Sequence, residues 1–83
     1  MNIDERVGLN IRKYRLAHRL TLEELAKRIH KSKSTISKYE KGLISLDMPT
    51  MEEISRELKI SPIQLLAAAD TGSDREYLSL IHI

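Results

Sequence analysis

The sequence has no cysteine, tryptophan or phenylalanine, and only three glycines and two prolines among its 83 residues. Without cysteine the chain cannot be a disulfide-stapled secreted domain. So few glycines and prolines exclude a low-complexity segment. The longest apolar run, residues 65–69, is far shorter than the roughly 20 residues that span a membrane. Since no signal-peptide pattern opens the chain, we expect a cytoplasmic protein with no membrane partner.

The length leaves room for one small domain and a short tail. Hydrophobic residues make up 41% and charged residues 31% of the chain, a balance typical of a soluble globular domain. We expect a domain over residues 1–69 and a tail over residues 70–83.

The net charge of +2 hides an uneven distribution. Residues 6–41 contain eleven lysines and arginines against three acidic residues, a net charge of +8. Residues 42–83 contain three basic and seven acidic residues, a net charge of −4. Such asymmetry within one small domain favours a polyanion-binding face, although charge alone is equally compatible with a solvated basic surface.

Helix start signals recur along the chain. In a capping box, the side chain of the first residue accepts the backbone amide of a glutamate or glutamine three residues later, and that residue's side chain accepts the amide of the first. The sequence predicts such boxes at Asn2–Glu5, Thr21–Glu24, Thr50–Glu53 and Ser61–Gln64. Ser32 is a further expected N-cap. With apolar residues at helical spacing between them, these signals predict an all-α fold of five helices, at residues 3–18, 22–29, 33–41, 51–58 and 62–69.

The second and third predicted helices are separated by only three residues, 30–32. Helices joined by so short a segment must cross sharply, which is the geometry of a helix-turn-helix. Ala26 provides a small side chain at the expected crossing, and Ile36 is placed to pack back against it.

Residues 7–66 resemble the phage-repressor and Cro-like helix-turn-helix family, also called the lambda-repressor-like or xenobiotic-response-element type. The matching stretches are VGLNIRKYR (7–15), LTLEELAKRI (20–29), KSTISKYEKG (33–42) and PTMEEISRELKISPIQLL (49–66). The resemblance implies a five-helix bundle that binds double-stranded DNA with its third helix in the major groove.

Carried over by position, the resemblance implies that base edges are contacted by Lys33, Ser34, Ser37 and Lys38. Helical periodicity agrees, because these residues share one face opposite Ile36. Lysine can donate hydrogen bonds to guanine, and serine can act as a hydrogen-bond donor or acceptor with several bases. The alternative is an ordinary solvated polar face.

Phosphate contacts are expected beside that helix, from Thr21, Leu22, Ser32, Thr35 and Lys41. The family often has glutamine where Leu22 stands, so only backbone donors are expected there. Arg15 and Glu40 occupy positions that pair in relatives as a partly buried salt bridge. Arg19 and His30 stand where relatives use glycine, so a strained or adjusted turn is expected.

Two segments have an ambiguous pattern. Gly42 is the expected end of the third helix. The loop after it carries four apolar residues, Leu43, Ile44, Leu46 and Met48. We expect them to fold under the bundle as core rather than to lie near DNA or a dimer contact. In the tail, residues 77–83 fit a strand, whereas Ser73 with Glu76 predicts a short helix. An apolar tail must pack or find a partner. We expect a homodimer on a palindromic operator, with recognition helices roughly 34 Å apart.

The predicted function is a sequence-specific DNA-binding transcriptional regulator that represses by occupying an operator. The alternative is an antitoxin or antirepressor-type module that binds a protein partner through the tail, with secondary DNA binding. An enzyme fits poorly, because the sequence has no phosphate-cradling glycine loop and no metal-ligand spacing, and its histidines, 18, 30 and 82, are far apart. No cofactor or metal is expected.

Overall fold

The computed structural model describes residues 1–67, which form five α-helices and no strand. The helices are α1 (Ile3–Ala17), α2 (Leu22–Arg28), α3 (Lys33–Glu40), α4 (Met48–Glu57) and α5 (Pro62–Leu66). The predicted all-α, five-helix class is therefore confirmed. The expectations for the tail, residues 70–83, lie outside the described residues.

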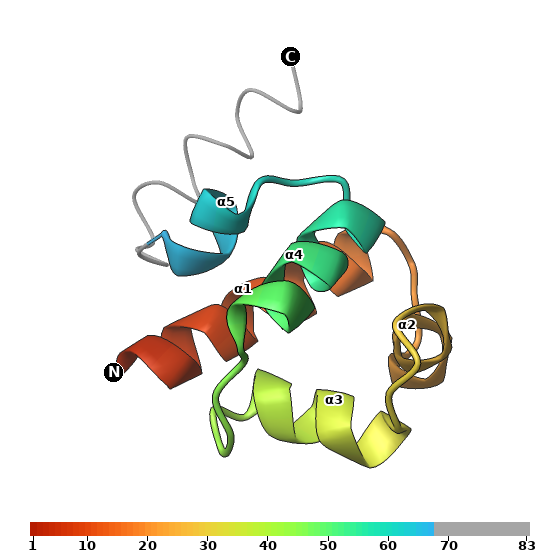
Figure 1. Ribbon diagram of the computed structural model, residues 1–83, viewed down its shortest axis with the longest axis horizontal. Coiled ribbons are helices and arrows are strands. Elements are labelled where there is room, and N and C mark those ends of the chain that lie inside the picture. Colours follow the sequence, from red (N-terminus) through yellow and green to blue (C-terminus); the bar gives the residue numbers. More distant parts are fainter. Residues whose placement is uncertain (68–83) are drawn as a thin grey trace.

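Helix α1 is central to the arrangement and packs against both α3 and α5, while α2 packs against α3 (Figure 1). In Figure 1 α2 is seen nearly end-on and α3 lies across the view, so the two helices cross steeply. The side chains at the centre of the bundle are wholly buried: Ile11, Leu25, Ile36, Ile54, Leu58 and Leu65. Each helix thus contributes at least one side chain to a single core. None of the helices in residues 1–67 has the length and apolar content to cross a bilayer.

Most of the expected N-caps are present. The Asn2 and Thr21 side chains accept the amides of Glu5 and Glu24 at 2.8 and 3.0 Å, and each glutamate reaches back to its partner's amide. Ser32 Oγ accepts the Thr35 amide at 3.1 Å.

The capping box expected at Thr50–Glu53 is wrong. Helix α4 begins three residues earlier than predicted, at Met48, and its N-cap is Asp47, whose Oδ1 accepts the Thr50 amide at 2.8 Å. Pro49 explains the earlier start, because proline fits the first helical turn, where its missing N–H needs no partner. Thr50 consequently lies buried inside the helix.

The first four helices of this part of the chain end in the same way. The residue after each C-cap has a positive φ: Arg19 (55°), His30 (57°), Gly42 (71°) and Lys59 (58°). The next amide donates to a carbonyl five residues back, for example from Leu20 to Arg15 at 3.1 Å and from Leu43 to Lys38 at 2.9 Å. This is the Schellman motif. The turns at Arg19 and His30 thus keep the left-handed backbone that relatives give to glycine.

The expectation that the loop after α3 folds into the core is wrong for three of its four apolar residues. Leu43, Ile44 and Met48 are exposed, and only Leu46 packs against the core. The loop is held on the surface at both ends, because Gly42 reverses the chain and Ser45 Oγ donates to Asp4 Oδ2 at 2.7 Å at the start of α1. The segment therefore connects α3 to α4 without crossing beneath the bundle.

A buried ion pair joins α1 to α3. The Arg15 guanidinium donates to both carboxylate oxygens of Glu40, at 2.6 and 3.1 Å, and also to the Leu20 carbonyl at 2.7 Å. Both residues are buried, Arg15 at 5% and Glu40 at 8% exposure. The helices can approach this closely because Gly8 has no side chain: a Cβ there would lie 2.3 Å from the Tyr39 carbonyl oxygen.

We expect Arg15→Ala to lower the free energy of unfolding by about 3 to 5 kcal/mol, because it leaves the Glu40 carboxylate buried without its partner. Urea unfolding followed by circular dichroism measures this change. Arg12→Ala is the matched control, since Arg12 is exposed on the same helix and its removal should have little effect. Equal stability of the two variants would contradict the structural role of the pair.

Candidate nucleic-acid interface

The outer face of α3 brings together the four residues expected to contact bases. Lys33, Ser34 and Lys38 are exposed and Ser37 is half-buried, whereas Ile36 on the opposite side is wholly buried. All four line one open hollow of about 440 Å³, which they share with Leu22, Lys41 and Leu43. The sequence periodicity therefore identified a real surface.

The hollow is positively charged. Among the described residues its lining includes three lysines and no carboxylate. One of these lysines has an acidic neighbour, because Glu23 Oε1 lies 3.6 Å from Lys33 Nζ. Both side chains of that pair are largely exposed, so it is weak and easily rearranged. Polyanions are the ligands that such a surface attracts.

The start of α2 lies beside this face but has a mixed charge. Thr21 and Leu22 line an adjoining hollow of about 410 Å³ together with Glu23, Lys33 and Arg15. The Thr21 amide and hydroxyl hydrogen-bond Glu24 and lower the pKa of that carboxyl below its ordinary value. Two carboxylates, Glu23 and Glu24, therefore stand at this helix start, and Lys33 offsets the first of them.

The remaining expected phosphate-contacting residues lie at the two ends of α3. Ser32 Oγ and Thr35 Oγ1 are 2.9 Å apart at its start, and neither residue lines the hollow. Lys41, the exposed C-cap of α3, does line it. The structure thus brings Lys41 and Leu22 together with the four residues expected to contact bases, and leaves Ser32 and Thr35 at the N-terminal end of α3.

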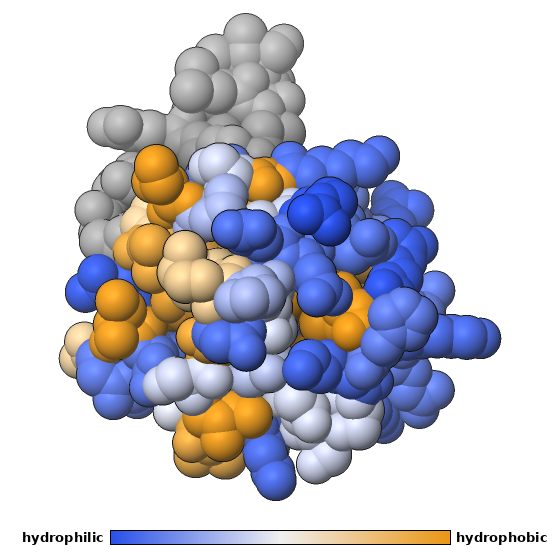
Figure 2. All heavy atoms as spheres, viewed as in Figure 1, coloured by the Kyte–Doolittle hydropathy of each residue, from blue (hydrophilic) through white to orange (hydrophobic). Residues whose placement is uncertain are grey.

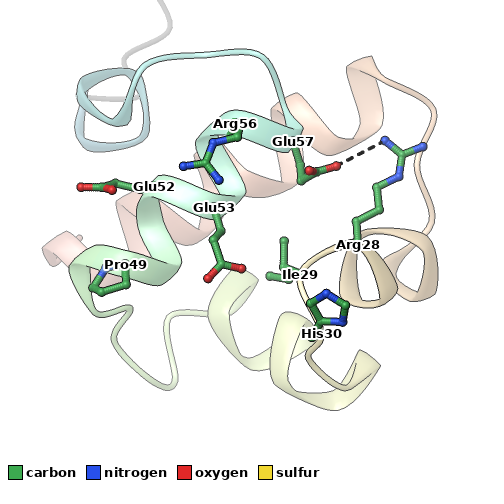
Figure 3. Close-up of a pocket in the computed structure, with 8 residues that line it drawn as sticks. All are labelled: Arg28, Ile29, His30, Pro49, Glu52, Glu53, Arg56 and Glu57. Atoms are coloured by element: carbon green, nitrogen blue, oxygen red, sulfur yellow. Dashed lines mark ion pairs between the residues drawn. The ribbon is translucent and has the colours of Figure 1, made fainter.

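A third hollow, of about 370 Å³, lies between α2 and α4 and has a different character (Figure 3). Three glutamates of α4, Glu52, Glu53 and Glu57, contribute to its lining. Arg28 pairs with Glu57 across it at 3.8 Å. The lining holds these three glutamates against two arginines, Arg28 and Arg56, so it attracts phosphate less than the lysine-lined hollow on α3 does. Within residues 1–67 no cluster of three or more histidines and carboxylates could hold a metal ion.

Hydropathy separates the faces further. Figure 2 shows hydrophobic side chains gathering on the side where α5 and the start of α1 lie, whereas the side over α2 is mostly hydrophilic. Exposed apolar residues of α5 include Ile63, at 75% exposure, and Leu66.

Sequence reasoning missed two residues that shape the interface or its support. Leu43, expected in the core, lies on the α3 face instead. Asn10 is buried in α1, and its Nδ2 donates to the Leu65 and Ala67 carbonyls at 2.8 and 2.9 Å, which anchors α5. The position of Leu43 directly after the left-handed Gly42 was the available signal, because it fixes the residue at the end of α3.

Comparison with solved structures finds the same fold in bacterial regulators. The Clp gene regulator ClgR from Corynebacterium glutamicum matches with a TM-score of 0.73 and 23% identity, over 81% of this chain and 95% of its own. The hypothetical transcription factor NHTF from Neisseria matches with a TM-score of 0.78 and 22% identity, over 95% of this chain and 85% of its own. The restriction-modification controller protein C.AhdI from Aeromonas hydrophila matches with a TM-score of 0.70 and 24% identity, over 74% of this chain and 92% of its own.

At these identities the three likenesses establish the fold. No curated protein matches the sequence. The family assignment comes from the sequence itself, since the helix-turn-helix family model matches residues 11–65, a span that runs from the middle of α1 through most of α5. The chain belongs to the phage-repressor and Cro-like helix-turn-helix family of DNA-binding transcription regulators.

Proposed function

We propose that this protein is a sequence-specific repressor that reads the major groove of its operator with α3 and carries out no catalysis. The observation that carries the proposal is the single lysine-rich hollow shared by Lys33, Ser34, Ser37 and Lys38. A helix with such a face fits the major groove, and in this motif its N-terminal residues contact base edges. Occupancy of a site that overlaps a promoter is then sufficient for repression.

Within this proposal the residues of and beside α3 have two roles: some contact base edges and so determine sequence preference, and others contact phosphates and so position the protein on DNA. Lys33 and Lys38 donate to guanine O6 and N7, and the two serines bond to whichever base edge they meet. Lys41, Ser32, Thr35 and the start of α2 at Thr21 and Leu22 bond phosphates, which fixes register without reading sequence. Lys41 is expected to contribute most among these, because it alone of the five is charged, and it is exposed and lines the hollow.

We further propose that the protein acts as a homodimer through α5 and the tail. The exposed side chains of Ile63 and Leu66 precede the apolar residues 77–83 in the sequence. Burying these groups between two copies removes apolar surface from water. A two-fold pair of domains presents two α3 helices to successive major grooves, roughly 34 Å apart.

Selection of bound duplexes from a random pool tests the function. We expect enrichment of inverted repeats whose half-sites lie one helical turn apart, with affinity that falls steeply as salt rises, because several phosphates are contacted. Failure to enrich any duplex would contradict DNA recognition and would favour the protein-interaction module. Enrichment of direct or single sites would contradict the symmetric dimer alone.

Substitution of two lysines tests the division of roles. Lys38→Ala should change which base is preferred at one position of the half-site, because it removes a base contact. Lys41→Ala should weaken binding to all DNA sequences alike, because it removes a phosphate contact. It should also make the slope of log affinity against log salt concentration shallower by about one. Binding of a panel of singly mutated operators at several salt concentrations measures both. If the variants behave identically, the division is wrong.

The oligomeric state is tested by sedimentation at micromolar concentration. We expect the full chain to sediment as a dimer and a chain lacking residues 74–83 to shift toward monomer. The bundle should survive truncation, because the buried core residues of the described part of the chain, from Val7 to Leu65, are all retained, and circular dichroism checks this. A monomer in both cases would contradict the dimer.

A further inference from the structure

Leu43 differs from the residues at the equivalent position of the other helix ends. In each of the four Schellman motifs within residues 1–67, this residue follows the left-handed one: Leu20, Lys31, Leu43 and Ile60. An apolar residue at this position normally packs back onto its own helix. Leu20 is buried and Ile60 half-buried, and Lys31 is polar and exposed. Leu43 alone of these four is apolar and exposed, at 67%.

The fold therefore does not account for the apolar character of Leu43. Its backbone already completes the motif through the 2.9 Å bond to the Lys38 carbonyl, which any non-proline residue could make. The side chain instead lines the hollow on the outer face of α3. Leu22, half-buried against the core, lines the same hollow. The candidate DNA surface thus has an apolar component that phosphate binding does not use.

The surroundings of these leucines indicate the chemistry of their partner. Lys33, Lys38 and Lys41 line the same hollow, and an apolar protein surface placed there would take the three ammonium groups out of water without compensation. A DNA duplex supplies phosphates for the lysines. It also supplies one apolar group on the base edges of the major groove, the C5-methyl of thymine.

We propose that Leu43, with Leu22 as the other apolar wall, receives the C5-methyl group of a thymine and is a specificity-determining residue of this protein. This inference rests on the proposed DNA-reading function and adds to it a base preference. Lysines read guanine, serines are tolerant, and Leu43 provides the contact that favours thymine over the other bases at its position.

The test removes the methyl group and nothing else. Each thymine of a selected operator duplex is replaced in turn by deoxyuridine, which keeps every hydrogen-bonding group, and binding to the full-length protein is measured by fluorescence anisotropy at fixed salt. We expect at least one replacement in each half-site to weaken binding by about four-fold, which is the effect of losing the burial of one methyl group. In Leu43→Ala that replacement should lose most of its effect, because Leu22 alone provides a smaller apolar contact.

Leu16→Ala is the matched control, because Leu16 is another exposed leucine, on α1 and outside the hollow. It should retain the thymine-over-uracil preference of the wild type. The proposal is overturned if the wild-type protein binds all deoxyuridine duplexes as tightly as the thymine duplex, or if Leu43→Ala keeps the preference. Absence of any selected duplex would overturn the proposed function, and this inference with it.

Discussion

The position of α3 depends on one buried guanidinium. Arg15 bonds the Glu40 carboxylate at the end of α3 and the Leu20 carbonyl in the segment that leads into α2. One side chain of α1 thereby ties together both helices of the helix-turn-helix. A charge buried in this way needs all its partners, because desolvation is costly. The same requirement gives the contact a specific geometry, so the outer face of α3 is held at a defined angle to the rest of the bundle.

The helix ends provide the second constraint on this geometry. The left-handed residues at positions 19, 30, 42 and 59 turn the chain at once after each helix, so the connections stay short and neighbouring helices cross steeply. Only one of the four is glycine. The others carry a backbone cost on the order of 1–2 kcal/mol each, which a small core must offset. Full burial of Ile11, Leu25 and Ile36 shows how completely that core is used.

Local chemistry explains which features could be predicted from the sequence. The starts of α1, α2 and α3 were correct because each depends on a cap and an amide three residues away. The prediction of which face of α3 is exposed was correct, because helical periodicity places the buried Ile36 opposite Ser34 and Lys38. The start of α4 and the loop before it were wrong, because Asp47 and Thr50 both fit a cap and the apolar loop residues suit either core or surface. Tertiary contacts such as Ser45 to Asp4 decide between these alternatives.

The composition of the α3 face bears on how specificity could arise. Lysine is a strongly hydrated point charge on a flexible stem, so under the proposed function Lys33 and Lys38 favour guanine and also add affinity for any polyanion. Serine accepts or donates and tolerates several bases. A face made only of such residues would distinguish guanine but would discriminate weakly among the other bases. Leu43 is anchored by a left-handed turn and a backbone hydrogen bond, and its side chain has no hydrogen bond to offer, so only shape and apolar contact can satisfy it. Under the proposed function, Leu43 would therefore add a preference for thymine to the guanine preference of Lys33 and Lys38, while the positive charge of the lysines attracts DNA to this surface.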